Sequence, residues 1–116
     1  MALFWWLPFG GTPEIGATEL ARALESAAPP QLVDVRSRAE FDRGHIRGAL
    51  SAPITSLATR VESLPLDVAR PVVAICFSAH RSIPAVRLLK QRGFEASQLA
   101  GGMLAWRAAK LPEESA

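Results

Sequence analysis

Apolar residues along the chain form two patterns, unbroken runs and repeats of helical spacing, and the two patterns alternate. The clearest run, Pro-Val-Val-Ala-Ile-Cys at 71–76, is typical of a central parallel strand covered on both faces. A similar run at 31–36 and a weaker one at 94–100 are also predicted to be strands.

Between these runs, apolar residues recur one helical turn apart and are bounded by capping or helix-breaking residues. Ser37 and Glu40 have the spacing of a capping box, which predicts a one-turn helix ending near Gly44. The longer helices are predicted at 17–26, 54–64, 82–92 and 104–110. Strands that alternate with helices predict an α/β fold, with a central, mostly parallel sheet of about five short strands and helices on both faces.

The chain length of 116 residues predicts one domain, which we place at 13–116 after an apolar N-terminal tail at 1–12. The tail begins Met-Ala-Leu-Phe-Trp-Trp-Leu-Pro-Phe, which is too short to span a membrane and lacks the basic start of a signal peptide. Two interpretations remain open. The tail packs on the domain or on a neighbouring chain, with self-association through 1–11, or it anchors the chain to a partner or a membrane surface.

Composition narrows the classes of function. Apolar residues make up 49% of the chain, which is enough for a core and excludes a mainly disordered protein. The single cysteine excludes an intramolecular disulfide, and the two histidines lack metal-binding spacing, so no metal or other cofactor is expected. A net charge of +2 argues against nucleic acid as a partner. With no targeting signal, no transmembrane segment and an unpaired thiol, we expect a cytoplasmic protein.

The candidate chemistry lies at 76–82, Cys-Phe-Ser-Ala-His-Arg-Ser, between the clearest predicted strand and a predicted helix. Open α/β sheets bind ligands beyond the carboxyl ends of their strands, and a short strand-to-helix loop aims several N–H groups at one point. Such a setting favours the thiolate of Cys76, and Arg81 adds a positive charge suited to an oxyanion. A cysteine after a buried strand is also often a small apolar residue, so the spacing alone leaves both interpretations open.

At this point the sequence resembles the rhodanese domain family. Residues 31–53, with Asp-Val-Arg and Gly-His-Ile-Arg-Gly-Ala, are similar to the first signature of that family, and 76–82 resembles its active-site loop. The runs at 88–94 and 99–106, which contains Ala-Gly-Gly-Met, are similar to a third region. The resemblance extends over roughly 13–111.

The resemblance implies a sulfurtransferase that moves a sulfane sulfur through a persulfide on Cys76. Its donor would be thiosulfate or a similar small molecule, and its acceptor cyanide, a thiol or a protein. The N–H groups of the loop would stabilise the anionic sulfur, and Arg81 would hold the donor. The substrate-binding residues implied are Phe77, Ser78, Ala79, His80, Arg81 and Ser82.

The length of the loop and one residue in it qualify this expectation. Cys76 and Arg81 enclose four residues, the short loop of sulfurtransferases rather than the longer loop of related phosphatases. Ala79 stands where the family often has glycine, and alanine would be strained there if the backbone were left-handed. A phosphatase or arsenate reductase of the same fold and a non-catalytic module that binds a partner or regulates remain as alternatives.

Other residues carry weaker predictions. Asp34 and Arg36 end a strand beside the loop and would either support the site or form a structural pair with a partner such as Glu40 or Arg43. His45 is expected to be structural, and His80 either contacts substrate or faces solvent. Phe77 and Trp106 are expected to pack, although Phe77 could also steer acceptors.

Overall fold

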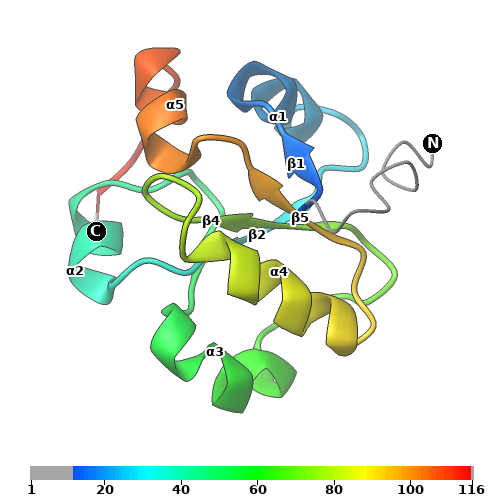
Figure 1. The fold of residues 1–116 in the computed structure, drawn as a ribbon. Helices are drawn as coiled ribbons and strands as arrows, with labels where there is room; N and C mark the ends of the chain where they lie inside the picture. Colours follow the sequence, from blue (N-terminus) through cyan, green and yellow to red (C-terminus); the bar gives the residue numbers. More distant parts are fainter. Residues whose placement is uncertain (1–11, 116) are drawn as a thin grey trace.

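The computed structural model describes residues 12–115, and within them the chain forms a parallel sheet between two layers of helices (Figure 1). The sheet has the order β1-β5-β4-β2-β3, and each neighbouring pair is parallel. The strands are β1 (Glu14–Ile15), β2 (Gln31–Asp34), β3 (Leu50–Ser51), β4 (Val72–Ile75) and β5 (Ala96–Leu99). The predicted α/β class, with its parallel sheet of short strands, is confirmed.

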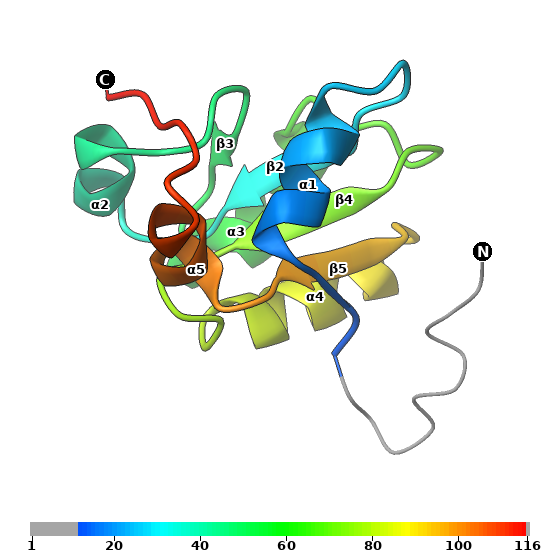
Figure 2. The ribbon, with the colours of Figure 1, turned by 90° about the horizontal axis from the view of Figure 1, so that it is seen from above.

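Helices cover both faces of this sheet, as Figures 1 and 2 show from two directions. In these views α3 and α4 lie on one face, α1 and α5 lie on the other, and α2 lies to one side near the C-terminus. The helices are α1 (Ala17–Leu24), α2 (Arg38–Arg43), α3 (Ile54–Arg60), α4 (Ser82–Gln91) and α5 (Gly102–Ala108), with a 3-10 turn η2 (Val61–Ser63) after α3.

The two faces of the sheet bury separate apolar clusters, which is why β4 is apolar along its whole length. Ala74 and Cys76 belong to the cluster beneath α3 and α4, whereas Val73 and Ile75 belong to the cluster beneath α1 and α5. Because successive side chains of a strand point to opposite faces, a central strand must be apolar at every position to satisfy both clusters.

Several boundaries differ from the sequence prediction. The predicted helix at 54–64 is divided into α3 and η2. The strand predicted at 31–36 is shorter in the structure, because β2 ends at Asp34. The strands β1 and β3 have two residues each, which is too short for an alternating pattern to reveal them. The predicted last helix starts earlier, because Gly102 enters α5 instead of staying in a turn.

The predicted N-terminal tail lies outside the described residues, apart from Thr12. Among residues 12–115, none of the helices has both the length and the apolar character that crossing a membrane requires.

Candidate functional site

The 76–82 loop begins directly after β4 and ends at the start of α4, at the carboxyl edge of the sheet. The start of α5 fixes the first two residues of this loop. The N–H of Met103 donates to the carbonyl of Cys76 at 2.8 Å, and the N–H of Leu104 donates to the carbonyl of Phe77 at 3.0 Å. The free N–H groups at the start of α5 therefore satisfy two carbonyls of the loop that precedes α4.

Gly102 makes this approach of α5 to the loop possible. Its φ is +58°, and a Cβ built on it would lie 2.5 Å from the Phe77 carbonyl oxygen and against the Cys76 carbonyl oxygen. Any side chain would push the helix away from the loop, so glycine is required here by space as well as by conformation.

Hydrogen-bond donors surround the sulfur of Cys76. The N–H of Ala79 donates to Sγ at 2.8 Å, while the residue as a whole is 1% exposed. Burial raises the pKa of the thiol, but hydrogen bonds from the Ser82 hydroxyl and from the N–H groups of Ser82, Arg81 and Ser78 lower it, and the net pKa is below its usual value. The loop therefore stabilises negative charge on this sulfur.

Ala79 adopts the left-handed conformation, with a φ of +79°. This is the conformation in which we expected an alanine at this position to be strained. This conformation turns the Ala79 N–H toward the sulfur it bonds. An L-residue in this region costs roughly 1–2 kcal/mol, so the loop holds local strain next to Cys76.

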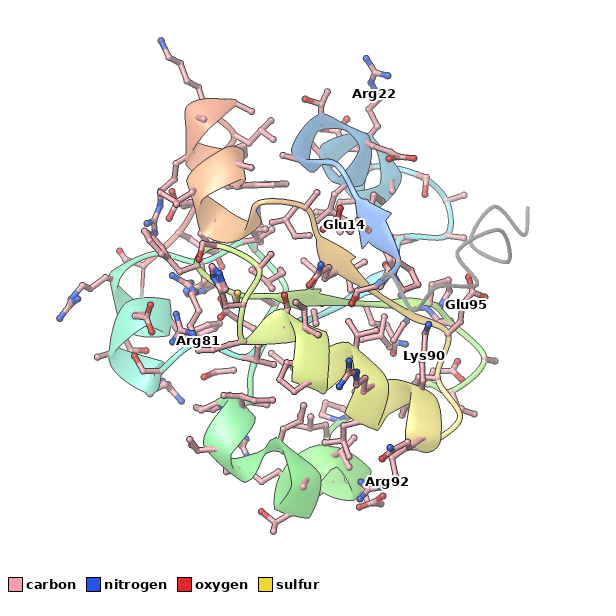
Figure 3. The ribbon with its side chains drawn as sticks, viewed as in Figure 1. Glu14, Arg22, Arg81, Lys90, Arg92 and Glu95 are labelled. Carbon is pink, nitrogen blue, oxygen red and sulfur yellow. The ribbon has the colours of Figure 1, made fainter. Side chains whose placement is uncertain are left out.

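Arg81, which is labelled in Figure 3, forms a two-pronged ion pair with Glu40 of α2. Its two terminal nitrogens donate to the two carboxylate oxygens at 2.6 and 2.9 Å. The Arg81 guanidinium, together with hydrogen bonds from Ser37, lowers the pKa of Glu40 from 4.5 to about 2, against the opposing effect of burial. Glu40 raises the pKa of Arg81 in return. The Glu40 carboxylate therefore fixes the orientation of the Arg81 guanidinium.

The sequence predicted that Glu40 caps its own helix and named it as a candidate partner for Asp34 or Arg36, but it did not connect Glu40 with Arg81. It does cap α2, since the N–H of Ser37 donates to Glu40 Oε1 at 3.0 Å, but the same carboxylate holds Arg81. The order of the strands explains why Glu40 and Arg81 meet. Because β2 and β4 are neighbouring parallel strands, the segments that follow them meet at one edge of the sheet.

Asp34 and Arg36 pair with each other, not with Glu40 or Arg43 as the structural interpretation expected. Arg36 Nε donates to Asp34 Oδ1 at 2.9 Å, and its Nη2 donates to Oδ2 at 2.7 Å and to the Gly44 carbonyl at 2.7 Å. Both residues are buried. The pair ties the end of β2 to the turn after α2, and Asp34 contributes to the raised pKa of Arg81.

The remaining candidates lie at different depths. His80 is exposed, and its Nδ1 lies 2.8 Å from the Ser78 hydroxyl. Phe77 is 38% exposed, so the expectation that it packs is wrong, whereas Trp106 is buried as expected. His45 is buried, stacks on Phe41 and has Nδ1 2.7 Å from the Phe41 carbonyl oxygen, which is a structural arrangement.

Gln98, which the sequence did not single out, contacts the last residue of the loop, and Glu14 in turn contacts Gln98. The Ser82 hydroxyl donates to Gln98 Oε1 at 2.6 Å, and Gln98 Nε2 donates to Glu14 Oε2 at 2.8 Å. No local motif contains them, since Glu14, Ser82 and Gln98 belong to β1, α4 and β5.

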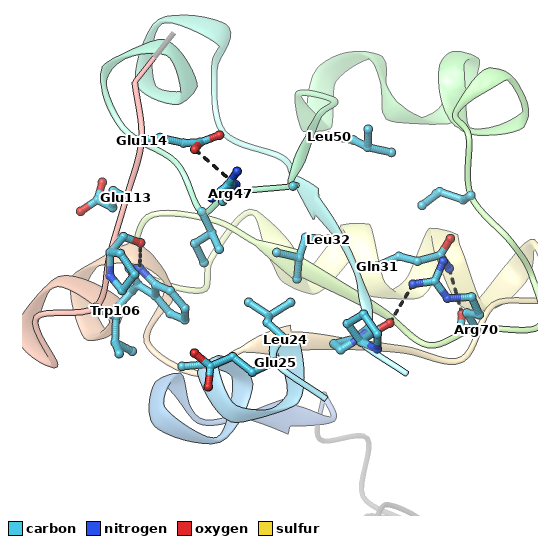
Figure 4. Close-up of a pocket in the computed structure, with 18 of the residues that line it drawn as sticks. Leu24, Glu25, Gln31, Leu32, Arg47, Leu50, Arg70, Trp106, Glu113 and Glu114 are labelled. Carbon is cyan, nitrogen blue, oxygen red and sulfur yellow. Dashed lines mark hydrogen bonds and ion pairs between the residues drawn. The ribbon is translucent and has the colours of Figure 1, made fainter. Parts of the chain in front are cut away.

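A groove of about 860 Å³ lies elsewhere, on the α1 and α5 side of the sheet (Figure 4). Leu24, Leu32 and Trp106 contribute to its apolar lining, and Arg47 and Arg70 lie at its rim. None of the described residues that line it belongs to the 76–82 loop. The chemistry of the loop is therefore separate from this groove.

The comparisons with known proteins agree with the geometry. The family model for the rhodanese-like domain matches residues 16–109. A sulfurtransferase of Allochromatium vinosum is 36% identical over 100 residues, which cover 85% of this chain and 92% of that protein. An HTH-type transcriptional regulator of Mycobacterium tuberculosis is 43% identical over 106 residues, 88% of this chain and 46% of that protein, so the chain spans about half its length. The solution structure of a rhodanese-like domain from Anabaena superposes with a TM-score of 0.80 at 34% identity, covering 91% of this chain and 81% of that one.

Proposed function

Because this chain belongs to the rhodanese-like domain family, we propose that it is a sulfurtransferase that carries a sulfane sulfur as a persulfide on Cys76. The observation that carries the proposal is the set of donors around the sulfur, above all the Ala79 N–H at 2.8 Å from Sγ. Such donors favour a thiolate before the reaction and an anionic persulfide after it.

In the first half-reaction, the Cys76 thiolate attacks the outer sulfur of thiosulfate or a similar donor. A bond forms between Sγ and that sulfur, the S–S bond within thiosulfate breaks, and sulfite leaves with the electron pair. In the second, cyanide, a small thiolate or a protein thiolate attacks the outer persulfide sulfur, and Cys76 leaves as the thiolate. The two steps balance without an external oxidant or reductant.

The other loop residues have supporting roles in this proposal. The N–H groups of Ser78, Arg81 and Ser82 lower the pKa of Cys76 and would share the charge of the persulfide. Arg81, oriented by Glu40, offers its remaining N–H groups to the anionic donor. Phe77 and His80 are exposed and would meet the acceptor, and Ala79 lies between them along the loop.

Asp34 and Arg36 would support the site by fixing the end of β2 beside the loop. We place this activity in one domain at 13–116 and in the cytoplasm, where the single thiol stays reduced.

Intact-mass measurement after incubation with thiosulfate tests the proposal directly. The wild-type chain should gain one sulfur atom, and Cys76→Ser should gain none. Because Cys76 is the single cysteine of the chain, the variant is a complete control. Addition of cyanide should remove the gained sulfur and release thiocyanate. A wild-type chain that gains no mass from thiosulfate or from a persulfide donor would refute it, since the nearly fully buried sulfur would then be out of reach.

The relative named as a transcriptional regulator supports a second candidate, a rhodanese-like module that regulates or binds a partner. The two candidates differ in their dependence on the thiol. A regulatory module that needs no persulfide would keep its cellular function in Cys76→Ser, whereas a sulfurtransferase would lose it.

A further inference from the structure

The cation that would receive the sulfur donor is already paired with a carboxylate. The two terminal nitrogens of Arg81 donate to the two carboxylate oxygens of Glu40, at 2.6 and 2.9 Å. Both side chains reach solvent, with 35% of Arg81 and 28% of Glu40 exposed, so an anionic donor that approaches Arg81 would meet both charges. A guanidinium paired in this way keeps N–H groups for a donor, but the carboxylate offsets its positive charge.

The negative charge of Glu40 is a permanent part of this pair. The hydrogen bond from Arg81 lowers the pKa of Glu40 to about 2, so the carboxylate is ionised at neutral pH. The carboxylate is also held from its own helix, because the N–H and the hydroxyl of Ser37 both donate to Oε1 at 3.0 Å. Glu40 is therefore fixed in position as well as in charge.

The charges beside the loop include one cation and two anions once the thiol has ionised. The pKa of Arg81 is raised chiefly by Glu40, and the charge of Cys76 adds to this effect, so the three groups lie within electrostatic range of one another. Thiosulfate carries two negative charges, whereas the anion of an alkyl persulfide carries one. Because Coulomb energy is proportional to charge, Glu40 opposes thiosulfate about twice as strongly as it opposes the persulfide.

We propose that Glu40 acts through Arg81 to make this site select a singly charged organic persulfide over thiosulfate as its sulfur donor. The carboxylate fixes the guanidinium and reduces the attraction that a second negative charge would gain. The inference rests on the sulfur transfer through Cys76 proposed above. In the loading step, the thiolate attacks the terminal sulfur of R–S–S⁻ and forms a bond between Sγ and that sulfur. The S–S bond of the donor breaks, and R–S⁻ leaves with the electron pair.

Timed intact-mass measurement of sulfur loading on the full chain gives one rate constant with thiosulfate and another with 2-hydroxyethyl persulfide. The quantity compared is the ratio of the thiosulfate constant to the persulfide constant, because a change in thiol ionisation cancels in it. Glu40→Gln removes the charge and keeps a side chain that can cap α2. Its ratio should be about fivefold higher than that of the wild type at low salt, the effect of one unit charge on one further charge several ångströms away.

Two further variants separate charge from contact. Asp42→Asn is the matched control, since Asp42 follows Glu40 by two residues on the opposite side of α2 and pairs with Arg38 at 2.8 Å. It loses the same charge and should keep its ratio within roughly twofold of the wild-type value. Glu40→Asp keeps the charge on a shorter side chain and should also keep the wild-type ratio. A ratio as high as that of Glu40→Gln in either variant overturns the proposal.

The salt dependence gives a readout that a purely structural role of Glu40 would not change. Salt screens repulsion between charges, so the wild-type ratio should rise with ionic strength, and the ratio of Glu40→Gln should rise less. The wild-type measurement needs no variant and decides the question if Glu40→Gln does not fold. A wild-type ratio that does not rise with salt, or an unchanged ratio in folded Glu40→Gln, overturns the proposal.

The two proposals fail separately. A chain that gains sulfur from both donors, with the same ratio in the wild type and in Glu40→Gln, keeps sulfur transfer and rejects the role of Glu40. A wild-type chain that gains sulfur from neither donor rejects sulfur transfer itself.

Discussion

Replacing Gly102 with alanine is expected to disturb both the stability of the fold and the geometry of the 76–82 loop. The residue begins α5 with a φ of +58°, and its missing side chain is what lets the helix N–H groups reach the carbonyls of Cys76 and Phe77. Alanine would meet both carbonyl groups at once. Because these atoms are backbone, a side-chain rotation cannot relieve the contact.

The magnitude follows from two contributions. The left-handed conformation costs alanine roughly 1–2 kcal/mol, and the stiffer unfolded chain returns about 0.4–1 kcal/mol of it. Overpacking against the loop adds roughly 1–3 kcal/mol. The contact with the Phe77 oxygen at 2.5 Å must open to at least 3.0 Å, so the helix or the loop moves by at least 0.5 Å. A total loss of about 2–4 kcal/mol corresponds to a fall in Tm of roughly 10 °C.

Gly93 offers a matched control. It also has a positive φ, +92°, but a Cβ there would meet only a Val68 methyl carbon at 3.5 Å, an ordinary contact. Gly93→Ala should therefore lose only the conformational part, about 1 kcal/mol. Its rate of sulfur loading from thiosulfate should equal that of the wild type, since Gly93 is far along the chain from the loop.

Thermal unfolding and timed intact-mass measurement together test the reasoning. Gly102→Ala should load sulfur about tenfold more slowly at a temperature where it is folded, because sub-ångström displacements of reacting groups are costly. The reasoning is refuted if Gly102→Ala is no less stable than Gly93→Ala, or if it loads sulfur at the wild-type rate.

Three further predictions concern neighbouring residues. Ala79→Gly relieves a φ of +79° and should stabilise the fold by about 0.5–1 kcal/mol in chemical denaturation, so a loss of stability would contradict the strain. The pKa of Glu40 is lowered from 4.5 to about 2, so its pairing with Arg81 stabilises the fold above pH 4.5 and is lost as the pH falls through 2. Urea titrations across this range should show an acid-dependent loss of about 1–2 kcal/mol, discounted for partial exposure, that is missing in Glu40→Gln. Asp34→Asn leaves Arg36 buried without its anion and should cost about 3–5 kcal/mol, so a near-neutral variant would show that the pair is not structural.

The sequence was sufficient to predict the α/β class and the place of the 76–82 loop in it. A strand that is buried on both faces must be apolar at every position, and all residues of β4 are apolar. The resemblance to the rhodanese family also indicated strain at Ala79, because the family often has glycine there and a left-handed position normally selects glycine. Two-residue strands such as β1 left no such trace, since two positions cannot show a period.

The partners of the polar side chains were decided by the tertiary structure alone. Glu40 has the spacing of a helix cap, yet it also binds Arg81, which lies 41 positions away along the chain. In the sequence, Gln98 is one polar residue of a weakly predicted strand. The strand order places it between Ser82 and Glu14, where it bonds to both. Local patterns reflect periodicity and sterics over a few residues, whereas a hydrogen bond between distant residues depends on strand order and register, which form only when the whole sheet assembles.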